Sequence, residues 1–391
     1  MKIGLVICYH IKNYGSVLQA FATQDVVSKL GINNECINYQ KSKRLKYLIL
    51  NSLRIFNGPL LKTKISNIKK SIYAKKNYEK FGKNFEIRDK KFDEFIKNNF
   101  QISDPFVGYD QLKKGAKRYS AFLLGSDQVW NPLNFGSHYY TLEFVPDNIP
   151  KLTYAASFGV SEIPWYQVNK TKKYLNRIDT ISVREEKGRA IIKNLIGRDV
   201  PVVLDPTLLL TKHEWKIVPE NKIYDFSYIF CYFLGTNPKH REFANKLKEI
   251  TGYKIVTLRH MDEIVLNDEG FGDVAPYDIG PNEFVNLIRN ASYICTDSFH
   301  GTVFSIIHKK NFFSFKRYSD GKKASTNSRL YSILNMLGLE SRLIDKKVDL
   351  NKMLEDEIDY DLVHKKLDDK REQSLDFLKK TLSQVYEFQK S

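Results

Sequence analysis

Short apolar runs alternate with helical periodicity along most of the chain. An apolar run at residues 3–8 precedes a polar loop, a helical pattern at residues 16–30 and a second apolar run near residues 36–39. Short apolar runs of this kind are typical of buried strands, and an intervening helix lets two such strands pair in parallel. This order therefore predicts a βαβ unit at the start of the chain.

The same alternation continues in two series. In the first, strands are expected at 120–125, 151–157, 180–185 and 200–206, with helices near 166–176 and 185–195. In the second, strands are expected at 228–235, 254–258, 292–296 and 311–315, with helices at 238–249, 282–289 and 301–308. We predict an α/β fold of two Rossmann-like domains that face a cleft, residues 1–215 and 216–345. Residues 346–391 are expected to form a helical tail without a core pattern of its own, lying across the back of both domains.

The composition is typical of a folded protein with reduced thiols. The 391 residues are 42% hydrophobic and 13% aromatic, which is ample for two cores. The four cysteines are far apart, so we expect buried thiols and neither a zinc cluster nor a disulfide framework. The first residues, MKIGLVICYH, show no small-residue cleavage site, so no leader is expected, and no window approaches the roughly 18 apolar residues of a membrane span. We therefore expect a cytoplasmic protein.

Positive charge is concentrated in one segment. The net charge is +17, and residues 41–80 hold twelve Lys or Arg against one acid, which gives +11 of that total. Basic residues interleaved with bulky apolar ones suit an anionic membrane surface, where each charge is worth about 1 kcal/mol. Nucleic acid is the competing partner, but no RNA-binding motif, zinc finger or helix-turn-helix is visible, so it is not expected. A solvated helical insertion is the remaining alternative.

Candidate site residues follow the predicted strands. The carboxyl ends of the strands in both sheets should line the cleft, because ligands bind there in open α/β folds. The first domain contributes Asn13, Tyr14, Gly15, Ser16, Gln19, Gly125, Ser126, Asp127, Gln128, Ser157, Gly159 and Arg184. The second contributes Gly235, Arg259, Asp297, Ser298, His300, Gly301, Lys316 and Arg329.

Four of these candidates are cationic or carry a proton: Arg184, His300, Lys316 and Arg329. Such a set suits a small polyanion, because a guanidinium binds carboxylate or phosphate oxygens as a bidentate fork. The alternatives stay open: Arg184 could pair with a neighbouring glutamate, and His300 could simply pack a turn. Asp127 and Ser16 could act as helix caps.

Cofactor motifs are absent from the sequence. There is no Walker loop, HExxH or paired CxxC, and GFGDVA at 270–275 has no preceding strand and is followed by Pro276. We therefore expect neither a metal nor a nucleotide cofactor.

Several motifs occur together and in order. They are KIGLVICYHIKNYGSVLQAFAT, FLLGSDQVWNP, YAASFG, ISVREEKG, VVLDPTLLL, TDSFHGTVFSIIHKKNFFSF and NSRL followed by LGLE. From residue 2 to about 340 the chain thereby resembles the bacterial polysaccharide pyruvyl transferase family; the 41–80 insertion and the tail depart from it. The resemblance implies a fold similar to that of two-domain B-type glycosyltransferases. It also implies transfer of a pyruvyl group from phosphoenolpyruvate to two sugar hydroxyls, which forms a cyclic ketal and releases phosphate.

The resemblance further implies roles for individual residues. His300, Arg184 and Lys316 would hold phosphoenolpyruvate, together with Ser298, Gly301 and Arg329. His300 would donate a proton and Asp127 would be the base toward the sugar. The acceptor pocket would be formed by Asn13, Tyr14, Gly15, Ser16, Gln19 and Gln128.

The acceptor in this family is usually a surface-polysaccharide precursor, often lipid-linked, which would give the 41–80 segment a purpose at the inner face of the membrane. Two other functions remain open. One is a glycosyltransferase that uses a nucleotide sugar on the same scaffold. The other is a non-catalytic basic module that binds glycan or nucleic acid.

Overall fold

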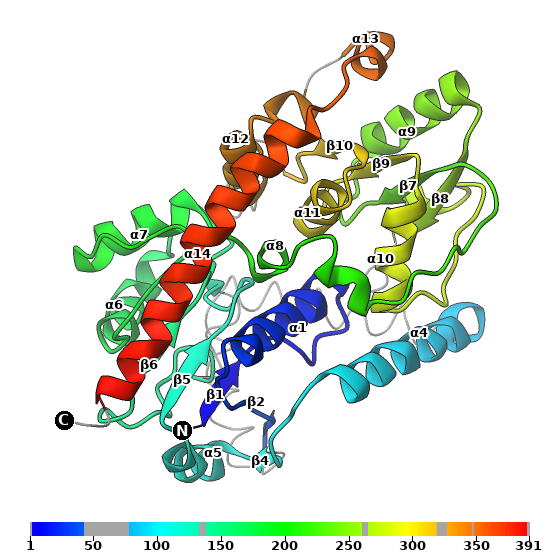
Figure 1. Ribbon diagram of the computed structural model, residues 1–391. Coiled ribbons are helices and arrows are strands. Elements are labelled where there is room, and N and C mark those ends of the chain that lie inside the picture. The colour runs from blue at the N-terminus through cyan, green and yellow to red at the C-terminus, as the bar shows by residue number, and fades with distance from the viewer. Residues whose placement is uncertain are drawn as a thin grey trace.

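The chain folds into two α/β units, each built on a parallel sheet (Figure 1). The computed structural model describes residues 2–42, 78–132, 138–259, 265–318, 327–345 and 348–388. The sheet of the first unit has the order β2-β1-β5-β6 and consists of β2 (Asn34–Cys36), β1 (Ile3–Val6), β5 (Ala121–Leu124) and β6 (Lys151–Thr153). Its neighbouring strands all pair in parallel, as the predicted βαβ connections require.

The second unit carries the larger sheet. Its order is β11-β10-β9-β7-β8, again parallel throughout, with β11 (Leu343–Ile344), β10 (Asn311–Phe315), β9 (Tyr293–Thr296), β7 (Tyr228–Tyr232) and β8 (Lys254–Leu258). A two-stranded pair, β3 (Tyr39–Gln40) with β4 (Phe106–Val107), lies beside the first sheet. Two parallel sheets with helices between their strands confirm the predicted α/β fold class.

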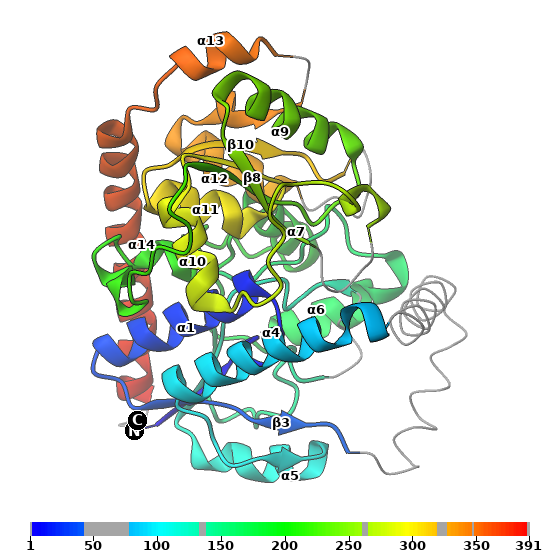
Figure 2. The same ribbon diagram turned by 90° about the vertical axis from the view of Figure 1, so that its right-hand side faces the viewer.

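Helices cover both sheets and connect the units. In the first unit they are α1 (Tyr14–Lys29), α4 (Tyr78–Asn99), α5 (Tyr109–Gly115), α6 (Val168–Asn176), α7 (Glu186–Ile196) and α8 (Pro206–Leu209). The second unit has α9 (Pro238–Thr251), α10 (Pro281–Asn290), α11 (Phe299–Ile307), α12 (Ser328–Leu337) and α13 (Leu350–Glu355), and α14 (Tyr360–Phe388) follows. Short 3₁₀ turns occur at Ala116–Arg118, Trp165–Gln167, Glu214–Ile217, Leu266–Asp268 and Glu340–Arg342. Figure 2 shows α4 lying in front of α1 and below α10.

Two segments predicted as strands are extended but pair differently. Residues 180–185 and 200–206 join the first sheet through isolated parallel bridges, Ala156 with Val183 and Val183 with Val202. The reason is local: Ser182 N donates to the hydroxyl of Thr153 instead of a backbone carbonyl, at 3.2 Å. Pro201 has no N–H to give to a ladder. The residues that follow Val183 and Val202 therefore still lie at the carboxyl ends of these two extended segments.

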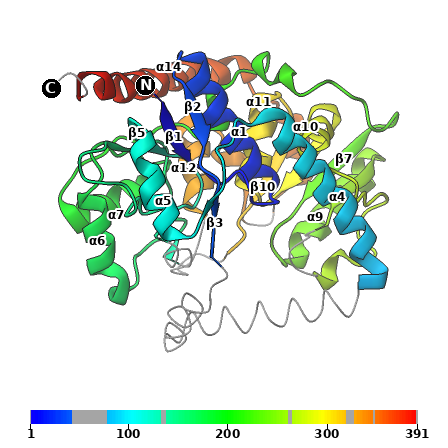
Figure 3. The same ribbon diagram turned by 90° about the horizontal axis from the view of Figure 1, so that it is seen from below.

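Helix α14 crosses both units. Near its start, His364 Nε2 lies 2.9 Å from the carbonyl of Ile306 in the second unit. Further along, Arg371 Nε donates to Leu208 O at 2.8 Å, and Ser374 Oγ accepts from Leu204 N. Figures 1 and 3 show the same course along one side of the molecule. Helix α14 therefore contacts both units.

The tail nevertheless has a core pattern, which the sequence analysis missed. It buries Val363, Leu367, Leu378, Leu382 and Val385. Most of these lie three or four residues apart, as expected for one face of a helix. The pattern was obscured because the rest of the helix is densely charged.

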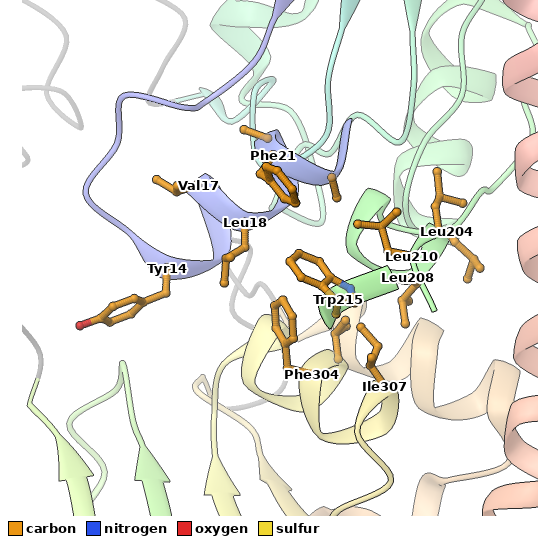
Figure 4. Packing of buried hydrophobic residues seen from close by; sticks show 14 of the residues in the cluster. Tyr14, Val17, Leu18, Phe21, Leu204, Leu208, Leu210, Trp215, Phe304 and Ile307 are labelled. Carbon is orange, nitrogen blue, oxygen red and sulfur yellow. The ribbon is translucent and has the colours of Figure 1, made fainter. Parts of the chain in front are cut away.

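An apolar cluster joins the two units (Figure 4). The Trp215 ring lies between Phe21 of α1, at 5.9 Å between centroids, and Phe304 of α11, at 4.9 Å. The indole N–H of Trp215 donates to the carbonyl of Thr207 at 3.0 Å, so the ring is anchored. This packing fixes α1 of the first unit against α11 of the second.

Other predictions have mixed outcomes. All four cysteines are buried and unpaired, as expected. Most of the basic 41–80 segment, residues 43–77, lies outside the described residues, so its predicted partner stays a prediction. Within the described part of the chain, each helix is too short or too polar to span a bilayer.

Candidate functional site

A buried aspartate lies close to basic side chains from both units. Asp205 follows the extended segment 200–204 and caps α8, its Oδ1 accepting from Thr207 N at 3.0 Å. Its Oδ2 accepts from Arg184 Nη1 at 2.6 Å. His300 of the second unit places Nε2 3.7 Å from that same oxygen. Arg184 and His300, distant in sequence, therefore lie at one point between the sheets.

His300 is held where a strand passes into a helix. Strand β9 ends at Thr296, and the Ser298 hydroxyl caps α11 by accepting from Gly301 N at 3.3 Å. His300 is in the first turn of α11, which begins at Phe299, two residues before the predicted start at residue 301. Gly15 of α1 lies against the other side of the ring, where a Cβ would come within 2.0 Å of His300 Nδ1. The imidazole is thus confined between Gly15 and Asp205.

Arg184 is surrounded by three carboxylates but bonds directly to one. Besides Asp205, Asp127 Oδ1 lies 3.6 Å from Nη2 and Glu185 Oε2 lies 3.8 Å from Nε. Among the described residues, Nε and Nη2 have no hydrogen-bond partner, although the side chain is 2% exposed. Buried donors are normally paired, so this edge of the guanidinium is available to a ligand with two acceptor oxygens.

The three carboxylates differ in proton affinity. Burial would raise the pKa of Asp205, but the charges of His300 and Arg184 outweigh it and the pKa is lowered. The pKa of Asp127 is likewise lowered against the effect of burial, by Arg184, His300 and the hydrogen bond from Ser16. Burial raises the pKa of Glu185, and Arg184 offsets this only in part. Asp127 and Asp205 are therefore anionic at neutral pH.

A second guanidinium lies close to Arg184. The ring of Phe299 has Arg184 Cζ at 4.6 Å and Arg329 Cζ at 5.7 Å from its centroid. Burial, and then the charge of Arg184, lower the pKa of Arg329 to about 10. Repulsion between two like charges near one ring therefore contributes to this lowered pKa.

The residues predicted as an acceptor loop, Asn13 to Gln19, instead form the N-cap and the start of α1, and residues 14–19 are buried. Ser16 Oγ donates to Asp127 Oδ2 at 2.6 Å, and Asn13 caps α1 by accepting from Ser16 N. Gln19 Nε2 donates to Ser16 O at 2.9 Å. The Tyr14 hydroxyl donates to the carbonyl of Ile279 at 2.9 Å. The structure thus ties this segment to the Arg184 cluster, and its role toward an acceptor stays a prediction.

Gln128 and Lys316, two further predicted residues, have partners of their own. Gln128 Oε1 accepts from Asn131 Nδ2 at 3.3 Å, and its side chain packs where a Cβ on Gly159 would be. Lys316 Nζ donates to Asp345 Oδ2 at 2.9 Å and lies 5.3 Å from the centroid of the Tyr331 ring. Lys316 therefore has a hydrogen-bonded anionic partner of its own.

Other candidates have local structural partners. Asp297 accepts from Leu234 N and Gly235 N at 2.6 and 2.8 Å, and Arg259 donates to the Tyr277 hydroxyl at 2.9 Å.

Sequence reasoning missed three residues of the cluster. Asp205, Glu185 and Phe299 were not selected, although each adjoins a predicted strand end. For Asp205 a signal existed, because it follows an apolar run just as Asp127 does. In the described part of the chain, no three or more His, Cys, Asp or Glu side chains are grouped so as to hold a metal ion.

Fold and site together define a two-domain α/β protein with a buried polar cluster where the carboxyl edges of its sheets meet. The family model for polysaccharide pyruvyl transferase matches residues 13–319, which include Arg184, Asp205 and His300. The chain therefore belongs to the polysaccharide pyruvyl transferase family. No curated protein matches it.

Solved structures resemble the chain weakly. UDP-GlcNAc 2-epimerase from Methanocaldococcus jannaschii is 12% identical with a TM-score of 0.49, covering 91% of each chain. The Neisseria meningitidis epimerase bound to UDP-GlcNAc is 10% identical with a TM-score of 0.49, covering 98% of this chain and 100% of its own. An alpha-glucosyltransferase in complex with UDP is 10% identical with a TM-score of 0.46, covering 97% of this chain and 95% of its own. These similarities carry no argument about activity.

Proposed function

We propose that the protein transfers a pyruvyl group from phosphoenolpyruvate to two hydroxyls of a sugar in a surface-polysaccharide precursor, forming a cyclic ketal and releasing phosphate. Membership of the polysaccharide pyruvyl transferase family supports the class of reaction. The observation that carries the donor assignment is the approach of Arg184 and His300, from different units, to one oxygen of Asp205.

The donor is held by its two anionic groups. A guanidinium binds a carboxylate or phosphate with two parallel N–H donors, and Nε and Nη2 of Arg184 are without partners in the described structure. Arg329 adds a second positive charge across the Phe299 ring. Phosphoenolpyruvate carries a carboxylate and a phosphate on three carbons, so one molecule can neutralise both arginines.

His300 supplies the proton that starts the reaction. As an imidazolium it protonates the methylene carbon C3, the C2=C3 π bond breaks, and a sugar hydroxyl adds to the electron-poor C2. The C2–O bond to phosphate then breaks, and a second hydroxyl adds to C2. Of the two hydroxyl protons, one ends on C3 by way of His300 and one leaves with phosphate. Asp205, beside Nε2, stabilises the imidazolium before it donates.

A carboxylate must accept the first hydroxyl proton. Asp127, the carboxylate that the family resemblance implies, is anionic and is held by Ser16. Residues 13–19 at the start of α1 and Gln128 are the proposed walls of the acceptor pocket, since they border Asp127. A lipid-linked acceptor would bring the basic 41–80 segment to an anionic membrane.

Incubation of the full chain with phosphoenolpyruvate and a panel of p-nitrophenyl hexosides tests the proposal. The expected result is release of inorganic phosphate together with a glycoside that has gained a pyruvylidene group, seen by mass spectrometry. Calorimetric titration with phosphoenolpyruvate and with UDP-sugars discriminates the rival donor. Binding of a UDP-sugar with no binding of phosphoenolpyruvate contradicts the proposal.

A further inference from the structure

The three carboxylates around Arg184 are not equally free. Both oxygens of Asp205 are engaged, Oδ1 by Thr207 and Oδ2 by Arg184 and Ser126. Asp127 Oδ2 accepts from the Ser16 hydroxyl at 2.6 Å. Glu185 Oε2, by contrast, is buried and has no hydrogen-bond partner among the described residues. A buried carboxylate oxygen without a donor needs an explanation.

Helix capping does not provide this explanation. Glu185 occupies the N-cap position of α7, yet its side chain makes no capping hydrogen bond. Instead Oε1 accepts from the Ser157 hydroxyl at 2.7 Å, and that hydroxyl accepts from Gly159 N at 3.1 Å. The side chain, whose residue is 1% exposed, is thereby fixed with Oε2 directed to the unpaired Nε of Arg184 at 3.8 Å. These two buried atoms of opposite charge thus face each other as an ion pair, and neither makes a hydrogen bond among the described residues.

Proton affinity separates Glu185 from the other two acids. A general base must hold a proton well enough to remove it from a hydroxyl, so a pKa nearer neutrality is favourable. Burial raises the pKa of Glu185, whereas those of Asp127 and Asp205 are lowered. The charged groups facing Glu185 are Arg184 on its own segment and Arg329 on α12, and both act against the effect of burial.

We propose that Glu185, and not Asp127, is the general base that removes the proton from the attacking sugar hydroxyl. This inference rests on the proposed function. The hydroxyl proton moves to Oε2 as the sugar oxygen bonds to C2 and His300 protonates C3. Glu185 then returns that proton to phosphate as the C2–O bond breaks. The second hydroxyl gives its proton to His300, so both residues regain their starting states.

Replacing Glu185 by glutamine tests this role, with Glu186→Gln as the matched control. Glu186 is the next residue and is exposed, its side chain at 67%, and it pairs only with Arg189 on the same helix at 3.7 Å among the contacts of the described chain. Phosphate release from phosphoenolpyruvate is measured against pH with a p-nitrophenyl hexoside that the wild type accepts. Wild-type kcat should fall at low pH because Glu185 becomes protonated. The midpoint of this fall should lie above the pKa of an ordinary glutamate.

The expected result for Glu185→Gln is a kcat lowered by about 10²–10⁴-fold, without the acidic limb and without a rise in KM for phosphoenolpyruvate. Glu186→Gln should behave as wild type. The inference is overturned if Glu185→Gln keeps both the wild-type kcat and the fall of kcat at low pH. It is also overturned if Asp127→Asn loses both while Glu185→Gln keeps them. If the glutamine variant does not fold, Glu185→Asp is measured instead. This variant should still show the fall of kcat at low pH, with a lowered maximal kcat. A wild-type kcat in Glu185→Asp overturns the inference. Failure of the wild type to turn over phosphoenolpyruvate contradicts the proposed function instead.

Discussion

Replacement of Gly15 by alanine tests whether the contact between α1 and His300 sets the geometry of the reaction. A Cβ on Gly15 would lie 2.0 Å from His300 Nδ1, whereas ordinary contact begins at 3.4 Å. The two groups must therefore separate by roughly 1.4 Å. A misplacement of about 1 Å can cost about a hundredfold in rate. We expect kcat for phosphate release to fall by about that factor in Gly15→Ala.

The stability of the same variant provides the control. Alanine favours a helix over glycine by about 1 kcal/mol, while overpacking a core costs about 1–3 kcal/mol. Gly15→Ala should therefore lower the free energy of unfolding in the wild type. In a His300→Ala background the imidazole is gone, and the same change should become neutral or stabilising. Denaturant unfolding measures both effects, and an equal loss in the two backgrounds refutes the reasoning.

Three further predictions concern Arg88, Asp205 and the basic 41–80 segment. Arg88 donates to Lys12 O and lies over the rings of Tyr14 and Phe92; Arg88→Met should loosen the loop before α1 and lower kcat/KM by about tenfold, and unchanged steady-state kinetics would contradict this. Asp205→Asn should cost about 3–5 kcal/mol in urea unfolding at neutral pH, because Arg184 loses its bonded anion. Because the pKa of Asp205 is lowered in the folded state, Asp205 contributes to the free energy of unfolding above about pH 4, and this contribution is lost as the pH falls further. The difference in unfolding free energy between wild type and Asp205→Asn must therefore shrink on acidification. The full chain should pellet with phosphatidylserine vesicles at about 0.1 M salt and lose this binding near 1 M; a chain with the lysines of residues 41–80 changed to glutamine should not bind, and salt-independent binding would count against the membrane role.

The sequence predicted the fold well because its strands are buried on both faces. Parallel strands such as Tyr228–Tyr232 read as continuous apolar runs, and the helices between them keep a helical period. The segment around Ser182 was predicted as a regular strand, but it pairs only through isolated bridges. The reason is that the hydroxyls of Ser182 and Thr153 make hydrogen bonds that a backbone ladder would otherwise make. The core residues of α14 were hidden among charges, and they became visible only where the helix meets both units.

The site was predicted only in part for a physical reason. Strand ends located His300, Arg184 and Asp127, because the carboxyl edge of a parallel sheet is set by topology. Which carboxylate bonds to Arg184 depends on side-chain packing within the first unit, and which one His300 approaches depends on how the two units meet. Sequence separation carries no information about either. Asp205, 95 positions before His300, was therefore missed.

Calorimetric titration of phosphoenolpyruvate into the wild type, Arg184→Met and His300→Asn tests the central claim most directly. The claim is that one donor molecule contacts side chains from both units at the Asp205 corner. It predicts saturable binding to the wild type and affinity lowered by at least about tenfold in each variant, the scale of one lost charge-assisted hydrogen bond. Wild-type affinity in either folded variant would show that this residue does not hold the donor and would contradict the account.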